Sequence, residues 1–219
     1  MLFADRFEAG RLLASRLAEF AERNDVVVLA LPRGGVPVGY EVAKALQAPL
    51  DIFVVRKLGT PGQEELAMGA LASGGITVLN QEVIQELDIS QETIDTAVSR
   101  EGPELERREL EYREGRPAVE VQGWTVILVD DGLATGSSMR VAAKALKKKL
   151  AAQIVVAVPV ASPSTCAEFE REVDKVICAV TPHPFWAVGQ WYRNFSQTTD
   201  EEVRELLRRS ADLQSRKVA

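Results

Sequence analysis

The stretch that decides the fold is Trp124–Met139, WTVILVDDGLATGSSM. It contains an uninterrupted apolar run, Val126–Val129, which ends abruptly in two adjacent acids, Asp130 and Asp131. A turn of small residues follows, and Ser137–Ser138 then begin a helical pattern. This order predicts a buried parallel strand, a loop at its carboxyl end, and a helix whose first backbone N–H groups have no partner within the helix.

The start of such a helix favours a phosphate group, because the free N–H groups and the helix dipole both attract negative charge. Two carboxylates beside a bound phosphate require a neutral or cationic group between them. Ribose hydroxyls and a divalent metal ion both meet that requirement, so the stretch indicates a sugar phosphate. The alternative is an ordinary strand, loop and helix in which Asp130 and Asp131 only cap the turn.

The segment Val126–Ser138 resembles the signature of type I phosphoribosyltransferases that binds phosphoribosyl diphosphate (PRPP). The resemblance implies that Asp130 and Asp131 hold the ribose hydroxyls, directly or through Mg²⁺, and that Asp131 is also catalytic. We name residues Asp130–Ser138 the signature loop. The contacts to ribose and 5′-phosphate implied by the resemblance come from Asp130, Asp131, Gly132, Ala134, Thr135, Gly136, Ser137 and Ser138.

Length and composition are those of one α/β domain over residues 1–219, with 46% hydrophobic residues. The net charge of −6 argues against a nucleic-acid partner, which usually meets a basic surface. The sequence has no apolar run of membrane length and no signal peptide, so we expect a cytoplasmic protein without a membrane partner. Cys166 and Cys178 are too few for a disulfide framework or a zinc site, and Cys178 is expected to be a buried thiol.

Helical patterns alternate with apolar, strand-like runs along the rest of the chain. The alternation predicts a mostly parallel, twisted sheet flanked by helices, the architecture that the resemblance also implies. In such sheets, ligands bind outside the carboxyl ends of the strands. The other main strands are expected at Val26–Leu31, Leu50–Val55, Ile154–Val160 and Val173–Val180.

Three loops follow the ends of expected strands: Pro32–Gly35, Arg56–Glu64 and the signature loop. Because the carboxyl ends of parallel strands share one edge of a sheet, we expect all three loops to meet in one crevice.

Helices are expected in three further regions. The first twenty-three residues form an amphipathic helix with Asp5 as its cap. Residues 76–122 form a helical insertion, in which Gly102-Pro103 should break or kink a helix. Its charged stretch Glu104–Arg116 is either a solvated helix, which we favour, or a cover for the active site or a partner subunit. Residues 181–219 are an aromatic loop and a closing helix.

We name residues Pro32–Gly35 the arginine loop. Its candidate binding residues are Arg33, Gly34 and Gly35. Glycine lets the backbone approach an anion closely, and the arginine side chain supplies a fork of donors. The loop is similar to the pyrophosphate loop of the same family, in which a strained or cis peptide is common, here near Arg33. A plain turn from strand to helix is the alternative.

Arg56 and Lys57 are two cations at the end of an expected strand. The resemblance implies that both bind pyrophosphate and act in catalysis, whereas by themselves they could equally be solvated. The segment Leu58–Glu64 has the composition of a mobile loop, and its place resembles the flexible loop that closes over PRPP.

The acceptor of the transferred group is the part of the predicted function that the sequence determines least. Trp186, Trp191 and Tyr192 lie in an aromatic loop, which forms either a stacking surface for a flat ligand or a small core beneath the closing helix. His183, the single histidine, is a weaker candidate for a catalytic base. Ala134 stands where many 6-oxopurine enzymes of the family have an acid, which argues against hypoxanthine or guanine as acceptor.

The expected function is therefore that of a phosphoribosyltransferase in nucleotide metabolism. Such an enzyme uses PRPP, Mg²⁺ and a small nitrogenous acceptor, and we expect a homodimer. The alternatives are a regulatory protein that senses PRPP or a nucleotide with little or no turnover, and a phosphohydrolase, for which no nucleophile is evident. A regulator that acts on nucleic acid would need a basic face, which this sequence lacks.

Overall fold

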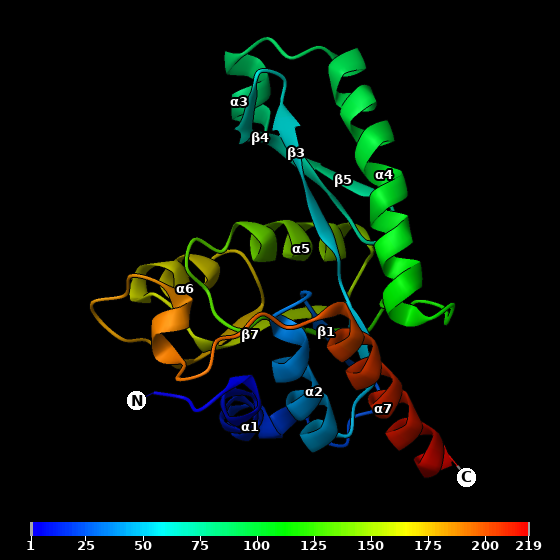
Figure 1. Cartoon of the computed structure of the whole chain (residues 1–219), viewed down its shortest axis with the longest axis vertical. Coiled ribbons are helices and arrows are strands. Elements are labelled where there is room, and N and C mark those ends of the chain that lie inside the picture. Colours follow the sequence, from blue (N-terminus) through cyan, green and yellow to red (C-terminus); the bar gives the residue numbers. More distant parts are fainter. Residues whose placement is uncertain (1, 219) are drawn as a thin grey trace.

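A five-stranded parallel sheet forms the centre of the computed structural model, which describes residues 2–218 (Figure 1). The sheet has the order β2-β1-β6-β7-β8, and each neighbouring pair of strands is parallel. The predicted architecture is therefore confirmed. The strands are β1 (Val26–Ala30), β2 (Leu50–Ile52), β6 (Thr125–Val129), β7 (Gln153–Val160) and β8 (Lys175–Val180).

Helices cover both faces of this sheet (Figure 1). Val27 and Leu29 of β1 belong to the apolar cluster on the side of α5 and α6, whereas Val26 and Val28 pack on the side of α1 and α2. Successive strand residues point to opposite faces, so a strand buried on both faces must be apolar throughout. The helices are α1 (Arg6–Arg16), α2 (Gly35–Leu46), α5 (Ser137–Lys148) and α6 (Pro163–Phe169).

A second, antiparallel sheet projects from the central one (Figure 1). It consists of β3 (Val55–Thr60), β4 (Gln63–Ala72) and β5 (Ile76–Leu79). Two expectations are wrong here. The strand predicted at Leu50–Val55 stops at Ile52, and most of the predicted loop Leu58–Glu64 is strand, with only a two-residue turn between β3 and β4. The exposed end of this hairpin needs few apolar residues, so its composition is that of a loop.

Two further helices pack around the projecting sheet and the edge of the central one. They are α4 (Gln91–Arg113), which contacts β3, β4 and α7, and α7 (Asp200–Val218), which contacts α2 and β2. The short helix α3 (Gln81–Glu86) precedes α4, and two 3₁₀ helices span Ala18–Phe20 and Val188–Trp191. None of the helices within residues 2–218 is both long enough and apolar enough to cross a membrane.

The structure corrects two predictions about helix ends. The first helix ends at Arg16, because the chain tightens into the 3₁₀ helix and buries Leu17 and Phe20 there. The prediction at Gly102-Pro103 is a break or a kink, and the break does not occur, because α4 continues through both residues. Gly102 has no Cβ to collide with the proline ring, so the helical conformation before Pro103 is tolerated.

The charged stretch Glu104–Arg116 is not the fully solvated helix that we favoured. Arg113 donates through Nε to Asp51 Oδ1 at 2.9 Å, and the two side chains are only 10% and 8% exposed. Leu105 and Tyr112 are also buried. This end of α4 is therefore fastened to the edge strand β2.

Cys166 and Cys178 form a disulfide, so the prediction of a buried thiol at Cys178 is wrong. Cys166 lies in α6 and Cys178 in β8, and packing of the helix on the strand brings their Cα atoms to 6.7 Å. That distance depends on how α6 folds back over the sheet, which cysteine spacing does not reveal.

We predict that Arg113→Ala lowers the free energy of unfolding by about 3–5 kcal/mol, because Asp51 would stay buried without its cation. Urea denaturation measures the loss. Arg107→Ala is the matched control on α4: Arg107 is 59% exposed and forms only surface ion pairs, so its loss should change the free energy of unfolding far less than Arg113→Ala does. Equal losses in the two variants would contradict the buried pair.

Candidate functional site

The candidate site lies where the chain reverses direction across the sheet. From β1 the chain continues through α2 to β2 on one side, whereas β6 continues through α5 to β7 on the other. The loops that follow β1 and β6 therefore diverge and leave a crevice between them at the carboxyl ends of the strands. Such a reversal point is the usual ligand site of open α/β sheets.

The arginine loop and the signature loop touch in this crevice. A Cβ atom on Gly34 would overlap Asp131 Oδ2, and one on Gly35 would lie 2.8 Å from the Val129 carbonyl oxygen. Only glycine permits this approach. The peptide bond between Pro32 and Arg33 is cis, which agrees with the feature implied by the family resemblance.

The two helices that start in the crevice have no side-chain cap. This holds for α2, which begins after Gly34, and for α5, which begins after Gly136. Four helices elsewhere each have a capping side chain, from Asp5, Asn80, Ser90 and Ser162. Ser137 and Ser138 are exposed, so the free N–H groups at the start of α5 are open to an anion.

The paired acids of the signature loop are not equivalent. Arg6 donates through Nε to Asp131 Oδ2 at 2.9 Å, whereas Asp130 Oδ1 accepts a hydrogen bond from the Asp131 backbone N–H at 2.8 Å. Burial, and then the negative charge of Asp131, raise the pKa of Asp130 well above its ordinary value. Burial also raises the pKa of Asp131, although Arg6 opposes that shift. Asp131 therefore pairs directly with a cation of the chain, whereas no ion pair to Asp130 forms among the residues that the structure describes.

Arg6 is a site residue that the sequence analysis missed. Its guanidinium lies 4.0 Å from the centroid of the Phe195 ring and donates to the Ser196 carbonyl oxygen at 2.7 Å, so it joins α1, the signature loop and the segment before α7. One weak signal was available: a cation in the first turn of a helix opposes the helix dipole and therefore needs another partner.

Neighbouring elements hold the signature loop in place. Thr165 of α6 donates through Oγ1 to the Ala134 carbonyl oxygen at 2.6 Å, and Arg140 donates to the Thr135 carbonyl oxygen at 3.3 Å. A Cβ on Gly132 would lie 2.5 Å from Val188 Cγ1, so the aromatic loop also packs directly on the signature loop.

The aromatic residues predicted to bind an acceptor have different environments. Trp186 is 78% exposed, whereas Trp191 stacks on Phe185 with 6.4 Å between ring centroids. Tyr192 is 5% exposed, and its hydroxyl donates to the Asp131 carbonyl oxygen at 2.5 Å. Burial raises its pKa far above the ordinary value. Trp191 and Tyr192 belong to a small core with Phe3, Ala9 and Val160, which contains no residue of the closing helix α7. The side chain of Trp186 is exposed.

Arg56 and Lys57 pair with groups outside the arginine loop and the signature loop. Arg56 pairs with Glu101 of α4, and Lys57 donates through Nζ to the Glu65 carbonyl oxygen at 2.9 Å. Within residues 2–218, no hydrogen bond or ion pair connects either cation to the signature loop or the arginine loop. The expectation that Arg56 and Lys57 follow the end of a central strand is wrong, because both lie within β3 on the projecting sheet. The meeting of all three loops in one crevice stays a prediction.

Arg33 lies near the start of α7. Its Nη1 atom is 3.8 Å from Asp200 Oδ1, which also accepts a hydrogen bond from the Tyr112 hydroxyl at 2.6 Å. Burial and the Asp200 hydrogen bond raise the pKa of Tyr112 to about 12. The arginine loop is thus connected to both α4 and α7.

The chain offers few ligands for a metal ion in this region. Among the described residues, no cluster of three or more His, Cys, Asp or Glu side chains is arranged to hold a metal. Asp130 and Asp131 are oxygen donors of the kind that Mg²⁺ prefers, and one Asp131 oxygen is already paired with Arg6. These two acids fit a Mg²⁺ ion that arrives with phosphate ligands and keeps several waters, as Mg²⁺ usually does.

We predict that Asp130→Asn stabilises the ligand-free protein by about 1 kcal/mol at neutral pH, because it removes a partly buried charge without a cation. A carboxyl with a raised pKa takes up a proton more readily in the folded state, so the stability of the wild type rises relative to Asp130→Asn as pH falls through that pKa. Thermal melts of both proteins between pH 7 and pH 4 measure the difference.

Asp131→Asn is the matched control for that experiment. It deprives Arg6 of its carboxylate and is therefore expected to lower the melting temperature at neutral pH. If Asp130→Asn also lowers the melting temperature at neutral pH, the inference that Asp131 is ion-paired and Asp130 is not is refuted.

Comparison with known proteins agrees with this geometry. Residues 5–192 match the family model described as "Phosphoribosyl transferase domain". A protein of Mycobacterium tuberculosis H37Rv, whose own assignment as a phosphoribosyl transferase is provisional, is 46% identical over 209 residues. The match covers 95% of this chain and 47% of that protein, so the chain spans about half the length of the curated relatives it matches.

Two solved structures have a similar fold. The crystal structure of TT1426 from Thermus thermophilus has a TM-score of 0.83 and 40% identity, covering 94% of this chain and 98% of that one. A hypothetical protein from Neisseria gonorrhoeae, solved with bound ppGpp, has a TM-score of 0.52 and 14% identity, covering 95% and 94%, which shows a shared fold only. On the family match over residues 5–192, this chain belongs to the phosphoribosyl transferase domain family.

Proposed function

We propose that this chain binds PRPP with Mg²⁺ and transfers the 5-phosphoribosyl group to a nitrogen atom of a small acceptor, releasing pyrophosphate. One observation carries the proposal: an acid pair lies between two helix starts without side-chain caps, where the chain reverses across the sheet. Membership of the phosphoribosyl transferase domain family supports it.

The 5′-phosphate is assigned to the start of α5. Its backbone N–H groups, with the hydroxyls of Thr135, Ser137 and Ser138, are exposed donors at the positive end of a helix dipole. The ribose hydroxyls would face Asp130 and Asp131, directly or through Mg²⁺. Bound Mg²⁺ would offset the charge of Asp130, which has no ion-pair partner among the described residues.

The pyrophosphate is assigned to the arginine loop and the start of α2. Arg33 is 37% exposed, and Gly34 and Gly35 leave the backbone accessible to phosphate oxygens. Arg56 and Lys57 would take part only after the hairpin of β3 and β4 moves, because Glu101 and Glu65 hold them on the projecting sheet.

The reaction places two demands on these residues. As the bond from C1 to the leaving oxygen breaks, negative charge grows on pyrophosphate and positive charge grows on the sugar. Arg33 and the N–H groups of α2 would stabilise the first charge, and the carboxylates of the signature loop the second. Movement of the hairpin over the site would keep water from the oxocarbenium-like sugar.

The acceptor would approach beside Trp186, which is 78% exposed on the loop that packs against Gly132. An exposed indole suits a flat base or an aromatic amine. Ala134 supplies no carboxylate to hydrogen-bond a 6-oxopurine, so hypoxanthine and guanine are not the acceptors we propose. The homodimer, the cytoplasmic location and the role in nucleotide metabolism remain predictions.

A regulatory protein that senses PRPP is the second candidate. The observation in its favour is that Arg56 and Lys57 are both occupied by groups of the chain itself. A protein in which Arg56 and Lys57 stay paired with Glu101 and Glu65 would bind PRPP without completing the reaction.

We predict that PRPP with Mg²⁺ at about 100 times the dissociation constant stabilises the wild type by about 2.7 kcal/mol, measured as a rise in melting temperature. The double variant Asp130→Asn, Asp131→Asn should lose this rise. Ribose 5-phosphate and pyrophosphate, each tested alone with Mg²⁺, report which half of the site contributes. A wild type that does not respond to saturating PRPP sinks the proposal.

An assay of pyrophosphate release distinguishes the enzyme from the regulatory protein that senses PRPP. With a panel of bases and amines, we expect turnover in the wild type and a loss of at least about 100-fold in Lys57→Ala, the range in which single charge-stabilising groups act. Lys44→Ala, on the exposed face of α2, is the matched control and should retain activity. Binding of PRPP without turnover on any acceptor would favour the sensor.

A further inference from the structure

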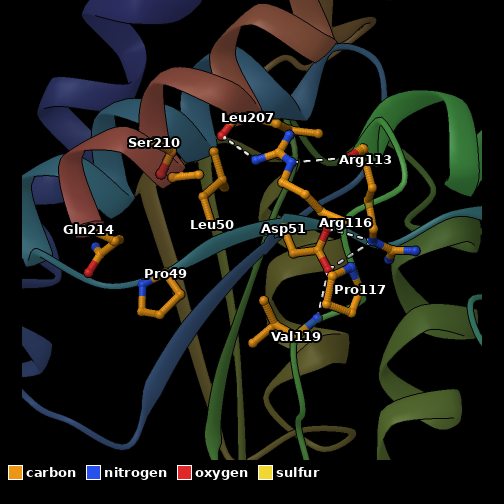
Figure 2. Close-up of a pocket in the computed structure, with 11 residues that line it drawn as sticks. Pro49, Leu50, Asp51, Arg113, Arg116, Pro117, Val119, Leu207, Ser210 and Gln214 are labelled. Carbon is orange, nitrogen blue, oxygen red and sulfur yellow. Dashed lines mark hydrogen bonds and ion pairs between the residues drawn. The ribbon is translucent and has the colours of Figure 1, made fainter. Parts of the chain in front are cut away.

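A second hollow lies beside the edge strand β2, away from the signature loop (Figure 2). Its volume is about 320 Å³, at the small end of the usual range for small-molecule pockets. Its lining comes from three segments that are far apart in sequence: residues 49–51, the turn after α4 at residues 113–119, and one face of α7 at residues 207–214. It shares no lining residue with the arginine loop or the signature loop.

The walls of the hollow are mainly apolar. Leu207 is 2% exposed, and its side chain and that of Ala211 lie one helical turn apart on the face of α7 that meets β2. Pro49, Leu50, Pro117 and Val119 also line the hollow (Figure 2). These walls favour a ligand with an apolar body.

Arg116 brings a positive charge to these walls. It donates through Nε to the Arg113 carbonyl oxygen at 2.9 Å and through Nη1 to the Leu207 carbonyl oxygen at 3.2 Å (Figure 2). Its Nη2 atom is buried, and no acceptor for it exists among the residues that the structure describes. Nor does any described carboxylate form an ion pair with Arg116. A partly buried guanidinium group without a carboxylate partner destabilises the folded protein unless an anion binds beside it.

Two polar side chains of α7 face the same hollow. Ser210 lines the hollow and is only 4% exposed. Gln214 lies one turn further along the same helix face (Figure 2). A hydroxyl and an amide beside a guanidinium group match the two oxygens of a carboxylate.

Asp51 limits the charge of the ligand. It also lines the hollow, but its oxygens already accept hydrogen bonds from Arg113 Nε and from the backbone N–H groups of Ile52 and Val119. It therefore cannot neutralise Arg116, and it would repel a ligand with several negative charges. These contacts favour one carboxylate over a phosphate or a diphosphate.

We propose that this hollow binds a small monocarboxylic acid with an apolar or aromatic body. The carboxylate would lie between Arg116 and Ser210, and the body would contact Pro49, Leu50 and Leu207. This site is independent of the proposed PRPP site, since the two share no residue.

The probes are benzoate, phenylacetate and hexanoate, each paired with its neutral primary amide. Titration of the full ¹⁵N-labelled chain is followed by NMR. We expect saturable shifts with at least one carboxylate, confined to the neighbourhood of residues 49–51, 113–119 and 207–214. The matched amide should bind at least about tenfold more weakly, the size of a lost charge-assisted hydrogen bond. Inorganic phosphate and pyrophosphate should not shift these signals.

Three variants localise the binding. Ala211→Phe fills the hollow and Arg116→Gln removes the cation, so each should weaken carboxylate binding at least about tenfold. Arg107→Gln, on the exposed face of α4, is the control and should bind as the wild type does. The double variant Asp130→Asn, Asp131→Asn should also bind as the wild type does, which separates this site from the PRPP site whether or not PRPP binds.

The proposal is overturned if no carboxylate of the panel binds, which would make the hollow a water-filled space. It is equally overturned if a carboxylate and its amide bind alike, or if Ala211→Phe binds as tightly as the wild type. Should a variant fail to fold by circular dichroism, the location of the shifts in the wild type decides the question alone.

Discussion

The parallel pairing of β1 with β6 is the constraint on which the rest of the site depends. Their register aligns Ala30 with Val129, so both strands end at the same level and both following loops enter one crevice. Each loop then leads into a helix that starts without a side-chain cap, α2 or α5. Free backbone donors from two helices consequently lie on either side of Asp130 and Asp131. A shift of this register by one residue would end the two strands at different levels and turn each side chain of the shifted strand to the other face of the sheet.

Holding two carboxylates so close together requires compensation from distant parts of the chain. Arg6 from α1 pairs with Asp131, and Tyr192 binds the carbonyl oxygen of the same residue. From the other side, Thr165 and Arg140 fasten the carbonyl oxygens of the loop. Burial, and then the negative charge of Asp131, raise the pKa of Asp130 well above the ordinary value, and a ligand that brings a cation would relieve both effects. The site is thus stable without ligand but incompletely neutralised.

The projecting sheet and α4 make contacts with each other and with the central sheet that the amino-acid composition of these segments did not reveal. The hairpin of β3 and β4 is polar at its exposed end, and α4 carries many charges, so both segments look solvated in the sequence. In the structure, Glu101 holds Arg56, and Arg113 binds Asp51 on the central sheet. The charges of α4 therefore organise contacts between elements. Sequence analysis could not assign those partners, because each lies more than forty residues away along the chain.

The sequence by itself determined the central sheet, its flanking helices and the chemistry of the signature loop. Val126–Val129 is apolar at every position, and the acids and glycine follow directly, so strand, loop and helix are local consequences of residue order. Only the tertiary structure decided that Arg6 reaches Asp131, that Arg56 and Lys57 lie on a separate sheet, and that Cys166 meets Cys178. Each of these contacts depends on how whole elements pack across the fold. Packing distances between elements are not encoded in the spacing of residues along the chain, so these outcomes had to be observed.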